Sequence, residues 1–166
     1  MQKYIVIADD LTGSNATCSL FKKSGLKAAS ILKLQGGVSY DVDVISYSTA
    51  SRGLDKEEAY KKVSEAIKIL KSKDVLVYNK RIDSTLRGNI GTEINAMLDN
   101  LEDDRIAVVV PAYPDSGRIV VNKTMLVNGV LLENSDAGKD PKTPIKTSCV
   151  ESLIQKGIKY SSTYFT

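Results

Sequence analysis

Short apolar runs that alternate with segments of helical periodicity constrain the fold of this chain more than any other feature. Two of the runs, YIVIA at residues 4–8 and IAVVV at residues 106–110, are apolar without a break. Strands that are buried on both faces of a parallel sheet have this pattern. Because helical segments separate such runs, the sequence predicts an α/β domain with a largely parallel sheet.

The remaining elements follow from the same patterns. Further strands are predicted at residues 28–34, 42–46 and 75–78, with a Gly36-Gly37 turn between the first two. Helices are predicted at residues 15–23, 55–71, 90–101 and 149–156, the first capped by Ser14 and ended at Gly25. Asn128-Gly129 between two apolar runs predicts a C-terminal β-hairpin. We therefore expect one domain over residues 1–166: a mostly parallel sheet flanked by helices, plus this hairpin.

Composition excludes several classes of partner. The net charge is only +3, and lysines and arginines are scattered among acidic residues, so the sequence predicts no nucleic-acid partner. No apolar stretch approaches the ~18 residues of a membrane span, and the N-terminal run is too short for a signal peptide. Cys18 and Cys149 are far apart, which favours a reducing compartment. We expect a cytoplasmic protein without a membrane partner.

Two absences narrow the chemistry. The chain has no histidine, so it cannot form a Ser-His-Asp triad or a His-ligated zinc site. It also contains neither G-x-x-x-x-G-K-[ST] nor G-x-G-x-x-G, the common phosphate-binding loops. Acid–base chemistry would depend on carboxylates, lysines or tyrosines, and no metal or cofactor site is predicted in this chain.

Polar loops follow the predicted strands, at the edge where open parallel sheets bind ligands. The first is ADDLTG at residues 8–13, in which Asp9 and Asp10 repel each other and need a cation, a helix N-terminus or a substrate hydroxyl nearby. Alternatively, one aspartate caps the next helix and the other is solvated. A cation, Arg52, follows the predicted strand at 42–46.

The second and third loops are richer in cations. KRIDSTLRGNIG at residues 80–91 places three cations, a carboxylate and two hydroxyls before a helix start, which favours an anion site. Alternatively, it is a solvated loop in which Ser84 or Thr85 turns the chain. PAYPDSGR at residues 111–118 forms a stiff turn that would present Tyr113 and Arg118, although most such segments are only turns.

These three loops, in this order and spacing, resemble the signature segments of the four-carbon acid sugar kinases. VNGV at 127–130 and DPKTPI at 140–145 fit the same pattern, and the likeness runs from about residue 1 to about residue 153. The resemblance implies an N-terminal domain that binds small sugar acids, such as threonate or erythronate, and a C-terminal domain that binds ATP. It implies the following substrate-site residues: Asp9, Asp10, Arg52, Lys80, Asp83, Ser84, Arg87 and Arg118.

The chemistry of these residues agrees with such a substrate. Arginine can bind a carboxylate through two parallel hydrogen bonds, and aspartate can accept hydrogen bonds from hydroxyls. Phosphoryl transfer also needs a base for the acceptor hydroxyl, and Asp10 and Asp83 are both candidate catalytic residues. The chain departs from the family at Asn15-Ala16, where the family usually has an Asn-Asp pair.

The family's glycine-rich nucleotide-binding segments do not occur before Thr166. We therefore expect the C-terminal ATP-binding domain to be absent, with ATP and Mg²⁺ bound there rather than here. The chain would then be the substrate-binding fragment or split subunit of a kinase, inactive alone, that acts with a separate ATP-binding chain. The alternatives are a stand-alone sugar-acid-binding module and a decayed kinase gene product. The sequence does not determine the oligomeric state, and a homo-oligomer is one of the candidates.

Overall fold

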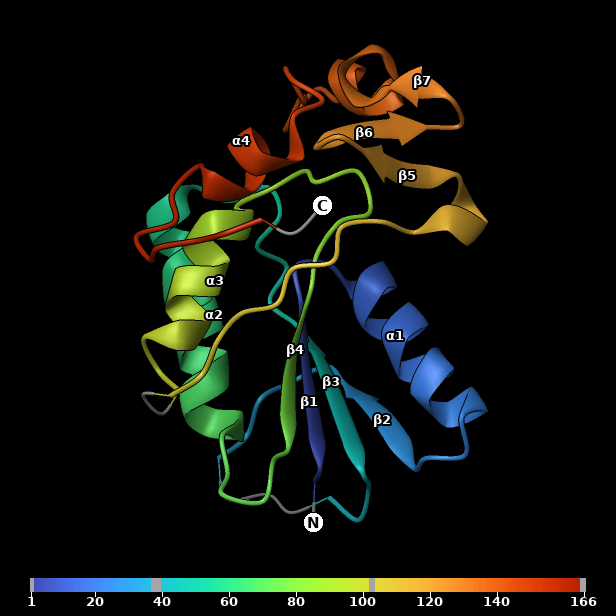
Figure 1. Ribbon diagram of the computed structural model, residues 1–166. Coiled ribbons are helices and arrows are strands. Elements are labelled where there is room, and N and C mark those ends of the chain that lie inside the picture. The colour runs from blue at the N-terminus through green and yellow to red at the C-terminus, as the bar shows by residue number, and fades with distance from the viewer. Residues whose placement is uncertain (1, 37–39, 102–103, 165–166) are drawn as a thin grey trace.

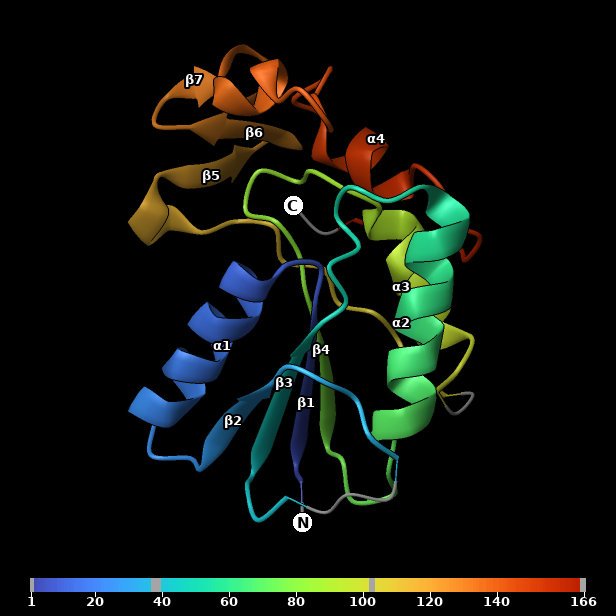
Figure 2. The same ribbon diagram turned by 180° about the vertical axis from the view of Figure 1, so that it is seen from behind.

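The computed structural model describes residues 2–36, 40–101 and 104–164, and the larger part of the fold has three layers (Figures 1 and 2). The central layer is a parallel sheet with the spatial order β2 (Ala28–Ile31), β3 (Val44–Ser48), β1 (Tyr4–Ala8) and β4 (Val77–Arg81). One face is covered by α1 (Leu11–Lys23), and the other by α2 (Lys56–Leu70) and α3 (Ile90–Leu98). The predicted fold class is confirmed.

A smaller part lies beyond the carboxyl ends of the parallel strands (Figure 1). Its antiparallel sheet has the order β5 (Arg118–Val121), β6 (Thr124–Val127) and β7 (Val130–Leu131). Short 3₁₀ segments at Pro114–Ser116, Leu132–Asn134 and Asp136–Lys139 surround it, and α4 (Val150–Gln155) connects it to α3. Within the described ranges, no helix combines the length and the apolar character needed to cross a bilayer.

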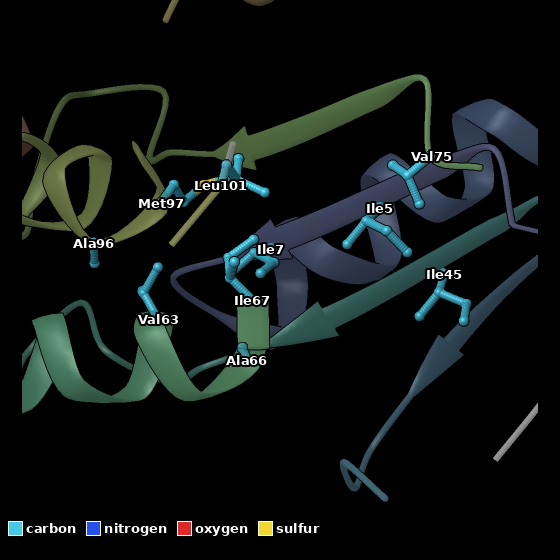
Figure 3. Close-up of a cluster of buried hydrophobic side chains, with 10 residues drawn as sticks. All are labelled: Ile5, Ile7, Ile45, Val63, Ala66, Ile67, Val75, Ala96, Met97 and Leu101. Carbon is cyan, nitrogen blue, oxygen red and sulfur yellow. The ribbon is translucent and has the colours of Figure 1, made fainter. Parts of the chain in front are cut away.

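The main hydrophobic core lies between the parallel sheet and the pair α2 and α3 (Figure 3). Alternate residues of the central strand β1, Ile5 and Ile7, point into it, together with Ile45 of β3. The apolar stripe of α2 supplies Val63 and Ile67, both fully buried. The opposite face of β1 is buried under α1, as an unbroken apolar strand requires.

A second core joins the smaller part to the main domain through α3. Ile90 and Ile94 on α3 pack with Met125 of β6 and Val150 of α4 in one buried cluster. The backbones approach closely at Gly91, where an added Cβ would lie only 2.6 Å from a carbonyl oxygen near α4. Helix α3 therefore fixes the smaller part over the carboxyl edge of the sheet.

The first helix begins earlier than predicted. It starts at Leu11 with Asp10 as N-cap, not at Asn15 with Ser14 as N-cap. The Ser14 side chain is instead buried, and its Oγ lies 2.7 Å from Ser46 Oγ on β3. Ser14 therefore joins α1 to the sheet instead of capping a helix end.

Three strand boundaries also differ from the prediction. The second strand stops at Ile31, the third runs over Val44–Ser48, and β4 runs over Val77–Arg81 rather than 75–78. Because β2 and β3 are parallel, a crossover of about a dozen residues joins them rather than a tight turn. Of the predicted Gly36-Gly37 turn, Gly37 lies outside the described residues.

The predicted hairpin at Asn128-Gly129 is confirmed between β6 and β7. Both residues have positive φ, 51° and 82°, as the favoured two-residue hairpin turn requires. A third strand, β5, was not predicted. It joins β6 through Asn122 and Lys123, which also have positive φ, so their conformation forms a turn without the usual glycine signal.

The prediction of a buried strand at residues 106–110 is wrong. The segment pairs with no strand among the described residues, and Ile106, Val108 and Val110 are 85%, 77% and 75% exposed. Only one side is packed, where Val109 contacts the second core. An unbroken apolar run is buried on both faces only if its backbone joins the sheet, and this one lies across a cavity from β4.

Val108 provides a test of this exposure. Val108→Thr is expected to change the free energy of unfolding by less than about 0.5 kcal/mol, because the side chain lies in solvent. As the control, Ile67→Ala in the main core should cost about 2–5 kcal/mol. Urea unfolding of both variants measures the difference. A loss at Val108 comparable to that at Ile67 would show that residues 106–110 are buried.

Candidate functional site

The loops that follow β1, β3 and β4 meet at the carboxyl edge of the parallel sheet, as predicted. Arg52, after β3, joins all three loops through its guanidinium group. Its Nε lies 2.7 Å from Asp9 Oδ2, its Nη1 lies 2.7 Å from Asp10 Oδ2, and its Nη2 lies 3.6 Å from Asp83 Oδ1. This guanidinium therefore offsets the repulsion between the adjacent carboxylates.

Asp10 has two roles in the structure. Its Oδ1 accepts a hydrogen bond of 2.6 Å from the backbone N–H of Gly13, so it caps α1. Its other oxygen faces Arg52. Gly13 leaves the space that this arrangement needs, because an added Cβ would lie 2.8 Å from Asp10 Oδ1 and 3.2 Å from Arg81 Cγ.

A tight turn surrounds the Asp83 carboxylate. Oδ2 accepts hydrogen bonds from Thr85 Oγ1 at 2.5 Å and from Arg87 Nε at 2.7 Å, and Oδ1 accepts one from Arg87 Nη2 at 3.0 Å. Leu86 takes a left-handed conformation with φ of 58° inside this turn, which is costly for a leucine. The other nitrogen of the Arg87 fork, Nη1, donates to Asp140 at 2.8 Å.

Electrostatics keeps these groups ionised. Burial on its own raises the pKa of Asp83, but hydrogen bonds from Arg87 and Thr85 and the charge of Arg52 outweigh burial and lower that pKa to about 2. The hydrogen bond to Asp83 raises the pKa of Arg87 above its ordinary value, against the effect of burial. Asp83 is therefore a weak proton acceptor and a strong anchor for the two arginines.

A cavity of about 250 Å³ opens among these loops. Its lining combines three arginines with two aspartates, two hydroxyl side chains and two small residues. The lining residues are Asp10, Thr12, Gly13, Ala16, Arg52, Arg81, Asp83, Ser84 and Arg87. The opening is smaller than the ~300–1,000 Å³ of sites for drug-sized ligands, which suits a small polar anion.

Three residues that the sequence predicted for the site lie outside this lining. Asp9 is 3% exposed and lies behind Arg52. Lys80 points to the opposite face of β4, where its Nζ lies 2.6 Å from Glu93 Oε2. Arg118 lies on β5 of the smaller sheet, and its Nε has no hydrogen-bond partner among the described residues.

Sequence reasoning missed four residues of the lining: Thr12, Gly13, Ala16 and Arg81. Arg81 is the notable omission, because β4 extends through it and side chains alternate along a strand. Lys80 therefore points toward α3, and Arg81 points toward the cavity and α1. Its Nη1 donates to the carbonyl of Ile82 at 2.5 Å, and it forms no ion pair within the described part of the chain. A longer predicted β4 would have identified it.

A larger cavity, of about 600 Å³, lies between β4, α3 and residues 105–110. Aliphatic side chains such as Leu76, Val77, Val108 and Val110 form much of its lining. Its lining includes Lys80, Arg81 and Arg105 but no aspartate or glutamate, so it lacks the combination of carboxylates and arginines found in the smaller cavity, and we assign the chemistry to the smaller one.

Comparison with known proteins identifies the domain. The profile of the family described as "Sugar-binding N-terminal domain" matches residues 4–166. D-erythronate kinase from Heliobacterium modesticaldum is 45% identical over 97% of this chain and 37% of its own length. D-threonate kinase from Salmonella typhimurium is 38% identical over 92% of this chain and 36% of its own length.

A solved structure agrees with these relatives. A domain of unknown function from Bordetella bronchiseptica, a domain-swapped dimer with bound citrate, matches with a TM-score of 0.81 and 32% identity. The match covers 92% of this chain and 39% of that one, and the chain spans at most about two-fifths of the proteins it matches. The chain belongs to the sugar-binding N-terminal domain family, the N-terminal part of the kinases that act on four-carbon acid sugars.

Proposed function

We propose that the small cavity binds a four-carbon sugar acid, such as erythronate or threonate, and that the chain is the sugar-acid-binding part of an ATP-dependent kinase. The observation that carries this proposal is the lining of three arginines, two aspartates and hydroxyl side chains around about 250 Å³. Such a lining offers charged donors for one carboxylate and acceptors for several hydroxyls. The D-erythronate and D-threonate kinases among the relatives support the choice of substrate class.

The contacts of the lining residues indicate a different role for each group of them. Arg52 and Arg87 are already paired with aspartates, so they hold the loops in place. Arg81 forms no ion pair among the described residues, so it is the group we assign to the substrate carboxylate. The hydroxyls of Ser84 and Thr12 line the same cavity and would contact the substrate hydroxyls.

Asp10 is our choice for the base that accepts the proton of the acceptor hydroxyl. The pKa of Asp83 is lowered to about 2, which makes that carboxylate a poor base near neutral pH. Asp10 makes fewer contacts, one with Arg52 and one with the Gly13 N–H, and it lines the cavity. We therefore propose Asp10 rather than Asp83 as the base.

The related Bordetella protein supports a site for small hydroxy acids, since it holds citrate, which carries carboxylates and a hydroxyl. That protein also forms a domain-swapped dimer, so we propose that this chain self-associates. The nucleotide and Mg²⁺ would be bound by a separate domain or chain, and the 166-residue chain by itself would not transfer phosphate.

Thermal unfolding with and without D-erythronate or D-threonate tests the proposed binding. At a ligand concentration tenfold above the dissociation constant, binding contributes ~1.4 kcal/mol. In a domain of this size that raises the melting temperature by roughly 3–6 °C. Succinate, which has carboxylates but no hydroxyls, is the control ligand and should give a smaller shift. No shift with either sugar acid would contradict the proposal and favour a decayed gene product.

Nucleotide-binding and kinase assays on the same purified chain distinguish the remaining alternatives. Titration with ATP and Mg²⁺ is expected to give no heat of binding, and a coupled kinase assay on the sugar acids should stay at the level without protein. Turnover by this chain alone would overturn the assignment of the nucleotide to another domain. If a nucleotide-binding domain from a relative restores turnover, the chain is a kinase subunit. Binding without restored turnover would favour a stand-alone sugar-acid-binding module.

A further inference from the structure

Glu93 on α3 is a buried carboxylate that does not line the proposed site. Its residue exposure is 1%, and its Oε2 lies 2.6 Å from Lys80 Nζ on β4. Its Oε1 accepts a hydrogen bond of 2.5 Å from Ser51 Oγ, after β3. One carboxylate therefore joins a helix to the ends of two strands beneath the site.

Each residue that this carboxylate holds is the chain neighbour of a site residue. Ser51 precedes Arg52, and Lys80 precedes Arg81. Lys80 Nζ also donates to the backbone carbonyl of Arg81 at 3.1 Å, so the ammonium group fixes the backbone at that position. Two of the three cavity arginines, Arg52 and Arg81, are therefore one peptide bond from a group that Glu93 orients.

The network continues to the end of β1. Thr49 Oγ1 lies 2.7 Å from Ser51 Oγ and 2.9 Å from the carbonyl oxygen of Ala8, and its one proton can be donated to either oxygen. Ala8 precedes Asp9, which pairs with Arg52. All three strand ends that carry site residues are thus connected through buried side chains to one carboxylate.

The first turn of α3 reinforces the same loop. Asn89 Nδ2 donates to the carbonyls of Ser51 at 3.3 Å and Leu54 at 2.9 Å, instead of capping its own helix. Asn89 and Glu93 are one helical turn apart, so they hold the loop after β3 at two points. The position of Arg52 is therefore set by α3 as well as by the aspartates it pairs with.

A buried ion pair is weak evidence for stability, because a well-packed apolar pair of similar size is often as stable or more stable. The arrangement of these contacts offers another reason for the Lys80–Glu93 pair. We infer that Glu93 is a positioning residue for the sugar-acid site, which orients Arg52 and Arg81 at the carboxyl edge of the sheet without touching the ligand. This inference rests on the proposed function.

Replacing the buried Lys80–Glu93 pair with apolar side chains distinguishes a positioning role of Glu93 from a contribution to protein stability. The double variant Lys80→Met/Glu93→Met is expected to melt close to the unaltered protein. Its affinity for D-erythronate, measured by calorimetry well below the melting temperature, should fall about tenfold. Ser51→Ala cuts the links toward Arg52 and the end of β1 but keeps the Lys80–Glu93 pair, so it should lower the affinity by a smaller factor. If the double variant melts normally and binds as tightly as the unaltered protein, Glu93 has no positioning role.

Ile67→Val is the matched control for a core change that does not touch the network. It should lower the melting temperature and leave the dissociation constant unchanged, because Ile67 lies on α2 in the main core. An equal loss of affinity in this control would overturn the inference, since any destabilisation would then weaken binding.

A ligand-free measurement distinguishes failure of this inference from failure of the proposed function. The Arg52 Nε–H donates to Asp9 at 2.7 Å, so its NMR signal reports the position of that guanidinium. We expect this signal to shift in both network variants and not in Ile67→Val. If the unaltered chain binds no sugar acid but the signal shifts, the proposed function is wrong and the positioning role stands. An unchanged signal in both network variants would overturn the inference.

Discussion

Replacing Asp83 by asparagine is expected to lower the free energy of unfolding by about 3–5 kcal/mol and to abolish sugar-acid binding. The carboxylate is 8% exposed, accepts hydrogen bonds from Thr85 and Arg87, and lies 3.6 Å from Arg52. Asparagine would present an amide N–H group to donors that need an acceptor, and two guanidinium groups would lose their shared charge partner. Urea unfolding at about neutral pH and calorimetry with D-erythronate measure both effects.

The effect should depend on pH with a known sign. Because the pKa of Asp83 falls from 3.8 to about 2 on folding, its ionised form stabilises the protein fully above the unfolded value. That stabilisation is lost as the pH falls through the folded value. The difference in stability between wild type and Asp83→Asn should therefore be constant from neutral pH to ~5 and shrink as the pH approaches ~2.

Asp41→Asn is the matched control. Asp41 also pairs with a cation, Lys27 Nζ at 3.2 Å, but its side chain is 94% exposed. Removing that charge should change the free energy of unfolding by less than about 1 kcal/mol. If Asp83→Asn costs no more than Asp41→Asn, the carboxylate is not the anchor of the site.

Local patterns predicted the central elements of the fold because tertiary structure agrees with them. The run at 4–8 is buried on both faces in the centre of the sheet, and the stripe of α2 faces the core. The run at 106–110 is also apolar without a break but pairs with no strand in the described part of the chain. An unbroken apolar run shows that burial is favourable, but it does not show which neighbour is available to bury it.

The site was predictable in its location and only partly in its members. Charged residues after parallel strands meet at one edge, so the loops around Asp10, Arg52 and Asp83 could be placed together. Which side chain faces the cavity depends on where β4 ends, because alternation separates Lys80 from Arg81. Strand ends are set by partners distant in the sequence, so a shift of three residues at the end of β4 reversed the expected roles.

Arg81→Met is expected to weaken D-erythronate binding by about 10–100-fold, the loss of a charge-assisted hydrogen bond to the carboxylate. Methionine keeps the apolar stem that packs beside Gly13. Among the described residues, the hydrogen bond that is lost is the one from Nη1 to the carbonyl of Ile82. The free energy of unfolding should therefore change by less than about 1 kcal/mol. Calorimetry and urea unfolding of the same samples separate affinity from stability.

Two other arginines provide the comparison for Arg81. Arg105→Met removes an exposed arginine whose guanidinium lies 4.9 Å from the Tyr78 ring, and it should leave affinity unchanged. Arg87→Met should lower both stability and affinity, because Arg87 pairs with Asp83 and Asp140. Normal binding by Arg81→Met would show that a paired arginine releases its aspartate to take the substrate. Selective loss at Arg81 would instead mean that the paired arginines build the site and the unpaired one binds the acid.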